Sequence, residues 1–219
     1  LGLFTLMFMF PAPIVFALLL NELRSQKFKR VTQTISYMPH FLSIVVVVGL
    51  LRDLTSSSDG AINQLIVLLG GEKIHFFTRP EWFRPMYIAS GVWQGVGFGS
   101  IIYLAAIAGI NPELYESAVI DGANRPAQIW HITIPSILPT IMILFILAVG
   151  GILGNDFHKI LLMYSPFVYE TADVIATYIY RVGIESAGSN FSYASAVGFF
   201  SALISLVFLL VTNKVAKTL

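Results

Sequence analysis

The stretch YESAVIDGANRPAQIWHITIPSILP, Tyr115–Pro139, decides how this chain is organised. It lies between two long apolar runs, yet it contains three charged side chains, a glycine and three prolines. Just upstream, Asn111 can cap a helix that begins at Pro112, because a proline at the first helical position gives up no helical hydrogen bond. We predict that this helix runs to about Ile120 and breaks at Asp121-Gly122.

A second short helix is predicted to restart at Asn124-Arg125-Pro126 and to continue toward Pro135 and the next apolar run. The expected result is a helix, a glycine elbow and a helix, with Glu116 and Asp121 near the bend. The apolar side chains available for contacts are Leu114, Ala118, Ile129 and Ile132. Helices this short are marginal alone in water, so another surface must pack on them.

The composition is that of a membrane protein. Of 219 residues, 56% are hydrophobic and 11% are charged, and the mean hydropathy is +0.78; a soluble domain carries about 25% charged residues. The formal net charge of +1 indicates no global field for nucleic acid or an acidic partner. The chain has no cysteine, which excludes disulfides and thiolate metal sites.

Five windows lack Lys, Arg, Asp and Glu, each of which costs roughly 2.5–3.5 kcal/mol at the bilayer centre. Each window can hold the ~20 residues that cross a bilayer as a helix. The predicted helices cover residues 3–20, 35–51, 86–109, 136–153 and 193–212. Pro11 and Pro13 should kink or break the first helix, and Pro39 should bend the second near its start. The predicted fold class is therefore all-α, a polytopic transmembrane helical bundle.

The orientation follows from the basic residues. The short connection 21–34 carries Arg24, Lys27, Lys29 and Arg30 against the single acid Glu22, so it should be cytoplasmic. Alternation then places 110–135 and the tail with Lys214 and Lys217 inside, and 52–85 and 154–192 outside. With five spans and the C-terminus inside, the N-terminus lies outside, from which we expect at least one further helix upstream.

The outer loop 52–85 contains an apolar run, AINQLIVLL, that is too short to span a bilayer. We expect a helix here that either lies at the outer surface and caps a cavity or packs on the bundle. Gly91, Gly95 and Gly99 recur at every fourth position of the third span, a spacing that favours close approach of another helix.

Several kinds of site are excluded by their missing motifs. The histidines His40, His75, His131 and His158 are scattered, with no pair at i,i+4, so no metal site is predicted. No Walker sequence is present. If the protein uses ATP, another chain must bind it, and we expect no enzymatic activity of its own.

The central segment resembles a known signature. It begins with Glu116-Ser117-Ala118, continues after three residues with Gly122, and ends after nine more with Ile132-x-Ile134-Pro135. This pattern is similar to the EAA motif of bacterial ABC importer permeases, E-A-A-x3-G-x9-I-x-L-P. Ser117 replaces an alanine and Ile134 a leucine. Further similarities to the sugar permeases are Asp121-Gly122-Ala123, Pro139, and FSYASAVG at Phe191–Gly198. With the run GSIIYLAAIAGINPELYESAVIDGA, the chain resembles most the polysaccharide or oligosaccharide permeases, over nearly its whole length.

The resemblance implies a type I ABC importer permease core, a single domain over 1–219, in which 110–135 is the coupling segment that docks on a cytoplasmic ATPase. The residues it implies for that contact are Leu114, Glu116, Ser117, Ala118, Asp121, Gly122, Ala123, Arg125 and Ile129. It further implies a second, different permease chain, two ATPase subunits that hold ATP and Mg, an extracytoplasmic solute-binding protein, and a place in the bacterial inner membrane. The cargo would be a carbohydrate, an oligosaccharide, moved by alternating access.

Polar groups at membrane depth mark candidates for the substrate path. Ser90, Trp93, Gln94 and Gly97 share one helix face, and an aromatic ring beside an amide suits a sugar. Equally open is that Trp93 belongs to the interfacial belt and that Gln94 bonds to a neighbouring helix. The other candidates are Asn155, Asp156, Tyr193 and Ser195. Three outer cations could attract an acidic sugar or contact a binding protein: Arg79, Lys159 and Arg181.

The alternative function is an ion-coupled secondary transporter. Such a protein usually carries an Asp, Glu or His inside its spans, and only His40 approaches this. An intramembrane enzyme would need a placed nucleophile, a metal set or an acid/base pair, which the spacing does not show. Dependence of uptake on ATP rather than on an ion gradient separates these classes.

Overall fold

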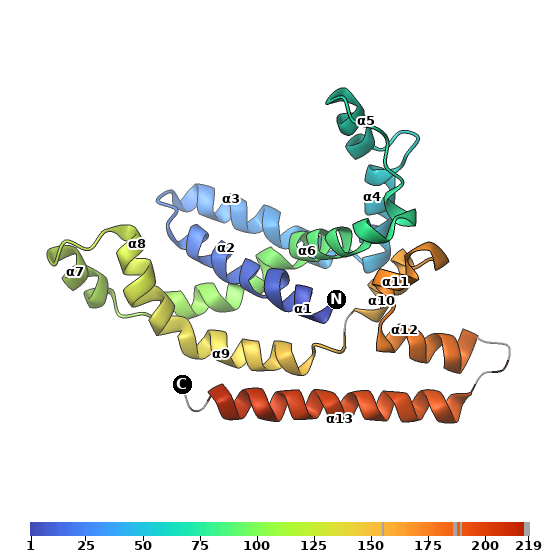
Figure 1. Cartoon of the computed structure of the whole chain (residues 1–219). Coiled ribbons are helices and arrows are strands. Elements are labelled where there is room, and N and C mark those ends of the chain that lie inside the picture. The colour runs from blue at the N-terminus through green and yellow to red at the C-terminus, as the bar shows by residue number, and fades with distance from the viewer. Residues whose placement is uncertain (155, 186–187, 189, 217–219) are drawn as a thin grey trace.

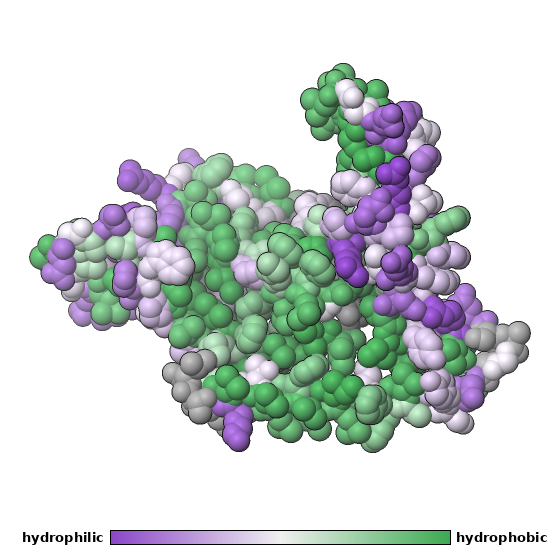
Figure 2. All heavy atoms as spheres, in the orientation of Figure 1, coloured by the Kyte–Doolittle hydropathy of each residue, from purple (hydrophilic) through white to green (hydrophobic). Residues whose placement is uncertain are grey.

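The computed structural model describes residues 1–154, 156–185, 188 and 190–216, and within these ranges it is built of helices without a strand (Figure 1). Two of the residues considered above, Asn155 and Lys217, lie outside the described residues. The long helices α2, α6, α9 and α13 run along one common direction, with the short helices gathered at their two ends. Figure 2 shows an apolar band over the long helices and polar side chains toward both ends. This distribution is that of a bundle that crosses a membrane.

The first span is one helical segment of 20 residues, Gly2–Asn21. It consists of α1 (Gly2–Phe4), the π turn η1 (Thr5–Met9) and α2 (Pro11–Asn21). Of the expected kink or break at Pro11 and Pro13, the break is therefore wrong. A proline clashes with the carbonyl one turn before it. Here the wider π turn, in which the Phe10 amide donates to the Thr5 carbonyl at 3.1 Å, directly precedes Pro11.

The second span is broken rather than bent. It begins earlier than expected with α3 (Gln26–Tyr37), passes through the 3-10 turn η2 (Met38–Phe41), and then turns by 102° into α4 (Ile44–Thr55). Leu42 is extended at the break, and the Ser43 side chain caps α4 by accepting from the Val46 amide at 3.4 Å. The expectation of one helix over 35–51 is corrected accordingly.

The remaining spans are longer than expected. α6 covers Pro80–Ala108 and α13 covers Phe191–Ala216. The fourth span begins at Arg125, because α8 (Arg125–Gln128), the π turn η4 (Ile129–Thr133) and α9 (Ile134–Gly150) form one segment of 26 residues. In all, four helical segments are long and apolar enough to cross a membrane, or five if the broken second span counts as one, among the described residues.

The α4–α5 arm, residues 44–74, projects from the bundle (Figure 1). α5 (Ala61–Leu68) confirms the predicted helix, but it packs on α4 at the end of the arm rather than on the bundle. The Asn63 side chain is 1% exposed and holds the loop together. It donates to the Thr55, Ser56 and Ile74 carbonyls at 3.0, 3.0 and 2.9 Å and accepts from the Ile74 amide at 2.8 Å.

Short helices also connect the spans at the two ends of the bundle. On the elbow side lies α7 (Pro112–Ile120). On the other side lie η3 (Phe76–Thr78), α10 (Phe157–Met163), η5 (Pro166–Val168), α11 (Tyr169–Ala172), α12 (Ile175–Tyr180) and η6 (Arg181–Glu185).

The core has two parts, both organised by α6. Its first half packs against α10 and α11 through Phe83, Met86 and Ile160, and its second half packs against α2 and α9 through Tyr103 and Ile137. The glycines of α6 differ in how closely a neighbouring helix approaches them. A Cβ on Gly97 would overlap the Ser36 carbonyl oxygen of α3, whereas a Cβ on Gly95 would meet nothing within 4 Å.

Candidate functional site

The first arm of the elbow forms for local reasons. The Asn111 side chain accepts from the Glu113 amide at 3.1 Å and so caps α7, with Pro112 in its first turn. At the other end, Gly122 has φ +83, a left-handed conformation that costs other L-residues about 1–2 kcal/mol. The Gly122 amide donates to the Val119 carbonyl at 3.1 Å and the Ala123 amide to the Ala118 carbonyl at 2.8 Å. This is the Schellman motif that ends a helix at a glycine.

The second arm starts three residues later and is continuous with the fourth span. The Asn124 side chain accepts from the Ala127 amide at 3.0 Å and caps α8. Because α8, η4 and α9 form one helical segment, any displacement of this arm moves the membrane-embedded part of the span with it. The predicted helix, elbow and helix are confirmed in this region.

Two hydrogen bonds close the elbow into a single unit. The hydroxyls of Tyr115 on α7 and Thr133 in η4 lie 2.9 Å apart, and the Gln128 amide nitrogen donates to the Ala123 carbonyl at 3.0 Å. Thr133 and Gln128 are 1% and 6% exposed, so water does not compete for these bonds. The Tyr115–Thr133 bond therefore fastens α7 to the fourth span, and the Gln128–Ala123 bond fixes the connection between the two arms.

The surface of the elbow carries most of the residues expected there. Leu114, Glu116, Ser117, Asp121, Gly122 and Arg125 are exposed, whereas Ala118, Ala123 and Ile129 are partly buried. Two exposed apolar side chains, Val119 at 62% and Ile120 at 86%, had not been singled out from the sequence. Their position just before the Asp121-Gly122 break, at a helix end placed in water, is the signal that could have identified them. Together they form an apolar patch with an acid, Glu116, beside it.

The candidates for the substrate path on α6 lie next to the broken span. Trp93 and Ser90 line an apolar cavity of about 340 Å³ between α6 and α4, with Val47, Leu50, Leu51, Leu54 and Ala89. The Ser90 hydroxyl is turned to its own helix and donates to the Met86 carbonyl at 2.5 Å. The Gln94 side chain donates to the Leu42 carbonyl at 3.1 Å, at the point where the second span breaks.

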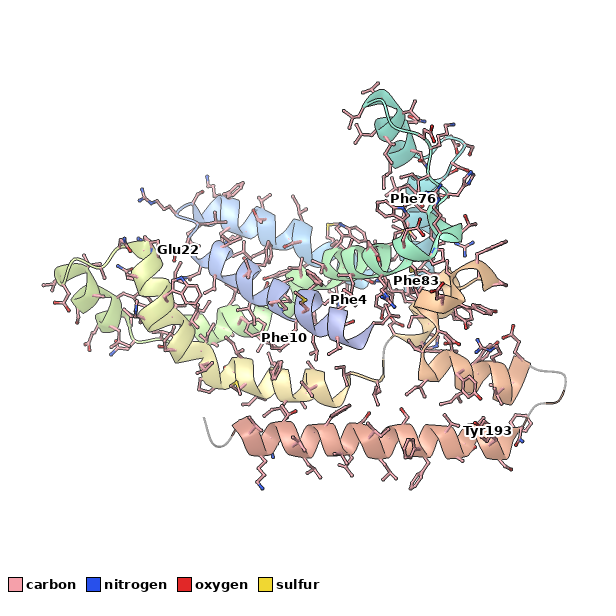
Figure 3. All side chains as sticks on the ribbon, viewed as in Figure 1. Phe4, Phe10, Glu22, Phe76, Phe83 and Tyr193 are labelled. Atoms are coloured by element: carbon pink, nitrogen blue, oxygen red, sulfur yellow. The ribbon has the colours of Figure 1, made fainter. Side chains whose placement is uncertain are left out.

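The other candidates lie toward the end of the bundle away from the elbow. Asp156 caps α10 by accepting from the Lys159 amide at 3.1 Å and lines a second cavity, of about 400 Å³, with Tyr87 and the first span. Tyr193 and Ser195 are exposed at the start of α13, and Figure 3 shows Tyr193 at the opposite end of the molecule from Glu22. The structure thus brings together Ser90 and Trp93, whereas Asp156 belongs to a different cavity.

The three cations named from the sequence as possible contacts for an acidic sugar or a binding protein each have a partner within the protein. Lys159 is 3% exposed; its ammonium donates to the Tyr87 carbonyl at 3.0 Å and lies 4.8 Å from the centre of the Tyr87 ring. Burial lowers the pKa of Lys159 to about 8, with the nearby Asp156 carboxylate opposing the shift. Arg181 pairs with Asp173 at 2.7 Å, and Arg79 is the third of the set, 3.8 Å from Glu81.

Helices long and apolar enough to cross a membrane, interrupted between two of them by a capped polar elbow, are the architecture expected of an ABC importer permease core. Comparison with known families agrees. Residues 9–219 match the family of the binding-protein-dependent transport system inner membrane component, and the chain belongs to that family.

Individual relatives are similar over most of this chain. The polygalacturonan/rhamnogalacturonan transport system permease protein YteP of Bacillus subtilis (strain 168) is 46% identical over 95% of this chain, and protein LplB of the same organism is 41% identical over 97%. The chain spans 64% and 66% of the length of these two relatives. A crystal structure of a bacterial ABC transporter involved in the import of the acidic polysaccharide alginate contains a chain that is 47% identical, with a TM-score of 0.96, covering 100% of this chain and 76% of that one.

Proposed function

We propose that this protein is the transmembrane permease subunit of an ATP-driven importer that moves a carbohydrate, an oligosaccharide, across the bacterial cytoplasmic membrane. The observation that carries the proposal is the elbow: a rigid, exposed pair of helices whose second arm is continuous with the fourth span. A displacement of α7 is therefore transmitted to the bundle through a helix, and no flexible loop between them absorbs it. The whole chain then acts as one permease domain, with 110–135 as its coupling segment.

ATP binding and hydrolysis are assigned to a separate subunit. In the proposed complex α7 sits in a cleft of a cytoplasmic ATPase, where Leu114, Val119 and Ile120 supply apolar contacts and Glu116 meets a basic side chain. ATP and Mg are held by two such ATPase subunits, and hydrolysis takes place there. ATP can change the bundle from inward-open to outward-open only by favouring one of these conformations through the docked elbow.

The remaining partners are proposed from the family and the relatives. A second, different permease chain completes the pathway, and an extracytoplasmic solute-binding protein delivers the sugar. The latter agrees with a crystal structure, 47% identical with a TM-score of 0.96, of the alginate ABC transporter in complex with an alginate pentasaccharide-bound periplasmic protein. The basic connection 21–34 supports a cytoplasmic location for the elbow side and for the C-terminus.

The proposed cargo is an oligosaccharide because the relatives named above transport polygalacturonan, rhamnogalacturonan and alginate. Trp93 is 46% exposed and lines the cavity between α6 and α4, so its ring offers a face on which a sugar can stack. For Gln94 to bond a sugar hydroxyl through its amide nitrogen, the sugar would have to replace or share the bond to the Leu42 carbonyl. Asn155, Asp156, Tyr193 and Ser195 are the outer candidates for the same path. Because the alginate transporter imports an acidic polysaccharide, acidic oligosaccharides are the first substrates to test.

The experiment is the purification of the tagged permease with its ATPase, followed by reconstitution. Glu116→Ala should leave the protein in the membrane but reduce the amount of ATPase retained and the rate of uptake. Glu170→Ala, at an exposed acid on a short helix at the other end of the bundle, is the matched control and should change neither. Uptake that continues after ATP depletion with a maintained ion gradient would support an ion-coupled transporter and refute the proposal.

A further inference from the structure

Glu22 is unusual in its surroundings. It is the only acid in the connection 21–34, which otherwise carries Arg24, Lys27, Lys29 and Arg30. An excess of cations explains the orientation of the chain, but it does not explain an acid at the first position after the span. A specific partner for Glu22 would explain it.

The structure provides that partner in the elbow, 103 residues further along the chain. A carboxylate oxygen of Glu22 lies 3.5 Å from a guanidinium nitrogen of Arg125. Figure 3 shows Glu22 at the end of α2, facing the beginning of α8. Beside the pair is a hollow of about 490 Å³, lined by the end of α2 and by Tyr115, Val119 and Gln128 of the elbow. The first span and the elbow thus approach each other through this ion pair and leave space around it.

The location of Arg125 adds to the case for an internal partner. Arg125 is the first residue of α8, where the helix dipole is positive and a cation is disfavoured by about 0.3–1 kcal/mol. Glu22 offsets both charges, that of the guanidinium and that of the helix end. The acids within the elbow do not take the place of Glu22 as partner of Arg125. Among the described residues, Arg125 forms its ion pair with Glu22.

We propose that Glu22 and Arg125 form a strap, a positioning pair that joins the first span to the coupling elbow so that both move together when the elbow is displaced. This inference rests on the proposed function. It assigns Arg125 to a contact within the chain, instead of the ATPase contact that the motif resemblance implies. A push on the elbow then reaches two spans: the fourth through the continuous helix 125–150, and the first through the strap.

Charge reversal tests the strap in the assembled transporter. Glu22→Arg and Arg125→Glu should each lower ATP-driven uptake about two- to fivefold, the range expected for one exposed ion pair. ATP hydrolysis should fall less than uptake, so more ATP is consumed per molecule imported. The double variant, which restores the pair with opposite polarity, should return both quantities to within twofold of wild type. Arg125→Lys, which keeps the charge, should behave like wild type.

Arg24→Glu is the matched control, because Arg24 is an exposed cation in the same connection. It should leave the ratio of ATP consumed to substrate imported unchanged. If the double variant remains as impaired as Arg125→Glu, Arg125 acts on the ATPase and the strap is refuted, while the proposed function stands. If the wild-type chain itself retains no ATPase, the proposed function fails and the strap fails with it.

Cysteine cross-linking tests the common movement directly, and the chain has no cysteine of its own. The pair Leu23→Cys with Pro126→Cys, one residue beyond each partner, leaves the ion pair in place and should cross-link with a short bifunctional reagent at the same rate, within twofold, with and without Mg-ATP. In a Glu22→Gln background, which removes the ion pair, the cross-linking rate of the same cysteine pair should change with nucleotide. A rate that changes more than fivefold with nucleotide while Glu22 is intact would mean that the two segments separate during the cycle, and would refute the inference.

Discussion

Replacement of Gly122 by alanine should weaken docking of the ATPase without disturbing the membrane part of the protein. At φ +83, an alanine loses about 1–2 kcal/mol relative to glycine. No heavy atom lies within 4 Å of the Cβ that would be added, so steric overlap contributes nothing and the backbone is the whole effect. A loss of this size changes the equilibrium between the formed elbow and its alternatives by about 5- to 30-fold.

The affinity for the ATPase falls in proportion to the fraction of elbows that are formed. We therefore expect Gly122→Ala to raise the dissociation constant by up to about 10-fold, and Gly122→Asn to raise it less, because asparagine tolerates the left-handed conformation better. The assay is a titration of ATPase subunit into the permease reconstituted in nanodiscs, with membrane insertion checked separately.

Gly70 provides a control with the same local structure. It has φ +86, ends α5 in the same Schellman motif, and has open space around its Cβ, but it lies on the α4–α5 arm. Gly70→Ala should carry the same strain and leave ATPase affinity unchanged. Wild-type affinity in Gly122→Ala, or an equal loss in Gly70→Ala, would refute the assignment of the elbow as the docking element.

Three further variants test the packing and electrostatics of the bundle. Gly97→Ala should destabilise the protein by about 1–3 kcal/mol because its Cβ overlaps a carbonyl of the facing helix. Gly95→Ala, whose Cβ lies in open space, should not destabilise it. Thermal unfolding in detergent measures both variants, and equal unfolding midpoints would contradict the packing described above. Asn63→Ala should open the α4–α5 arm to proteolysis at least several-fold faster, since it leaves buried backbone groups without partners, while the exposed Gln64→Ala should not. Lys159 has a folded pKa of about 8, below its unfolded value of 10.5, so the unfolded chain binds more protons between these values and stability should rise from about pH 8 to pH 10.5. Replacing Lys159 by methionine should flatten that rise, and a rise of the same size in the variant would show that other groups cause it.

Much of the elbow follows from local sequence. The caps at Asn111 and Asn124 and the glycine at the break act on backbone groups within a few residues, so their effect does not depend on the rest of the fold. The start and end of α7 and the restart of the helix at Arg125 were predicted correctly for this reason. The roles of the coupling residues and of Trp93 and Gln94 in transport stay predictions that the experiments above address.

The limits of the sequence appear at the second span and at the buried charges. Its apolar pattern and Pro39 predicted a bent helix but not a turn of 102° after Leu42, beyond which α4 packs against α10, an element more than 100 residues further along the chain. Likewise nothing near Lys159 in the sequence indicated that it would be buried against Tyr87 of α6.

The sequence by itself determined the all-helical class, the approximate positions of the spans and the elbow, because apolar length, caps and glycine conformation are properties of neighbouring residues. Only the tertiary structure decided that Glu22 faces Arg125, that Gln94 bonds to the broken second span, and that Lys159 is buried. Each of these contacts joins residues distant along the chain. Their geometry is set by the packing of whole helices, which no local pattern specifies.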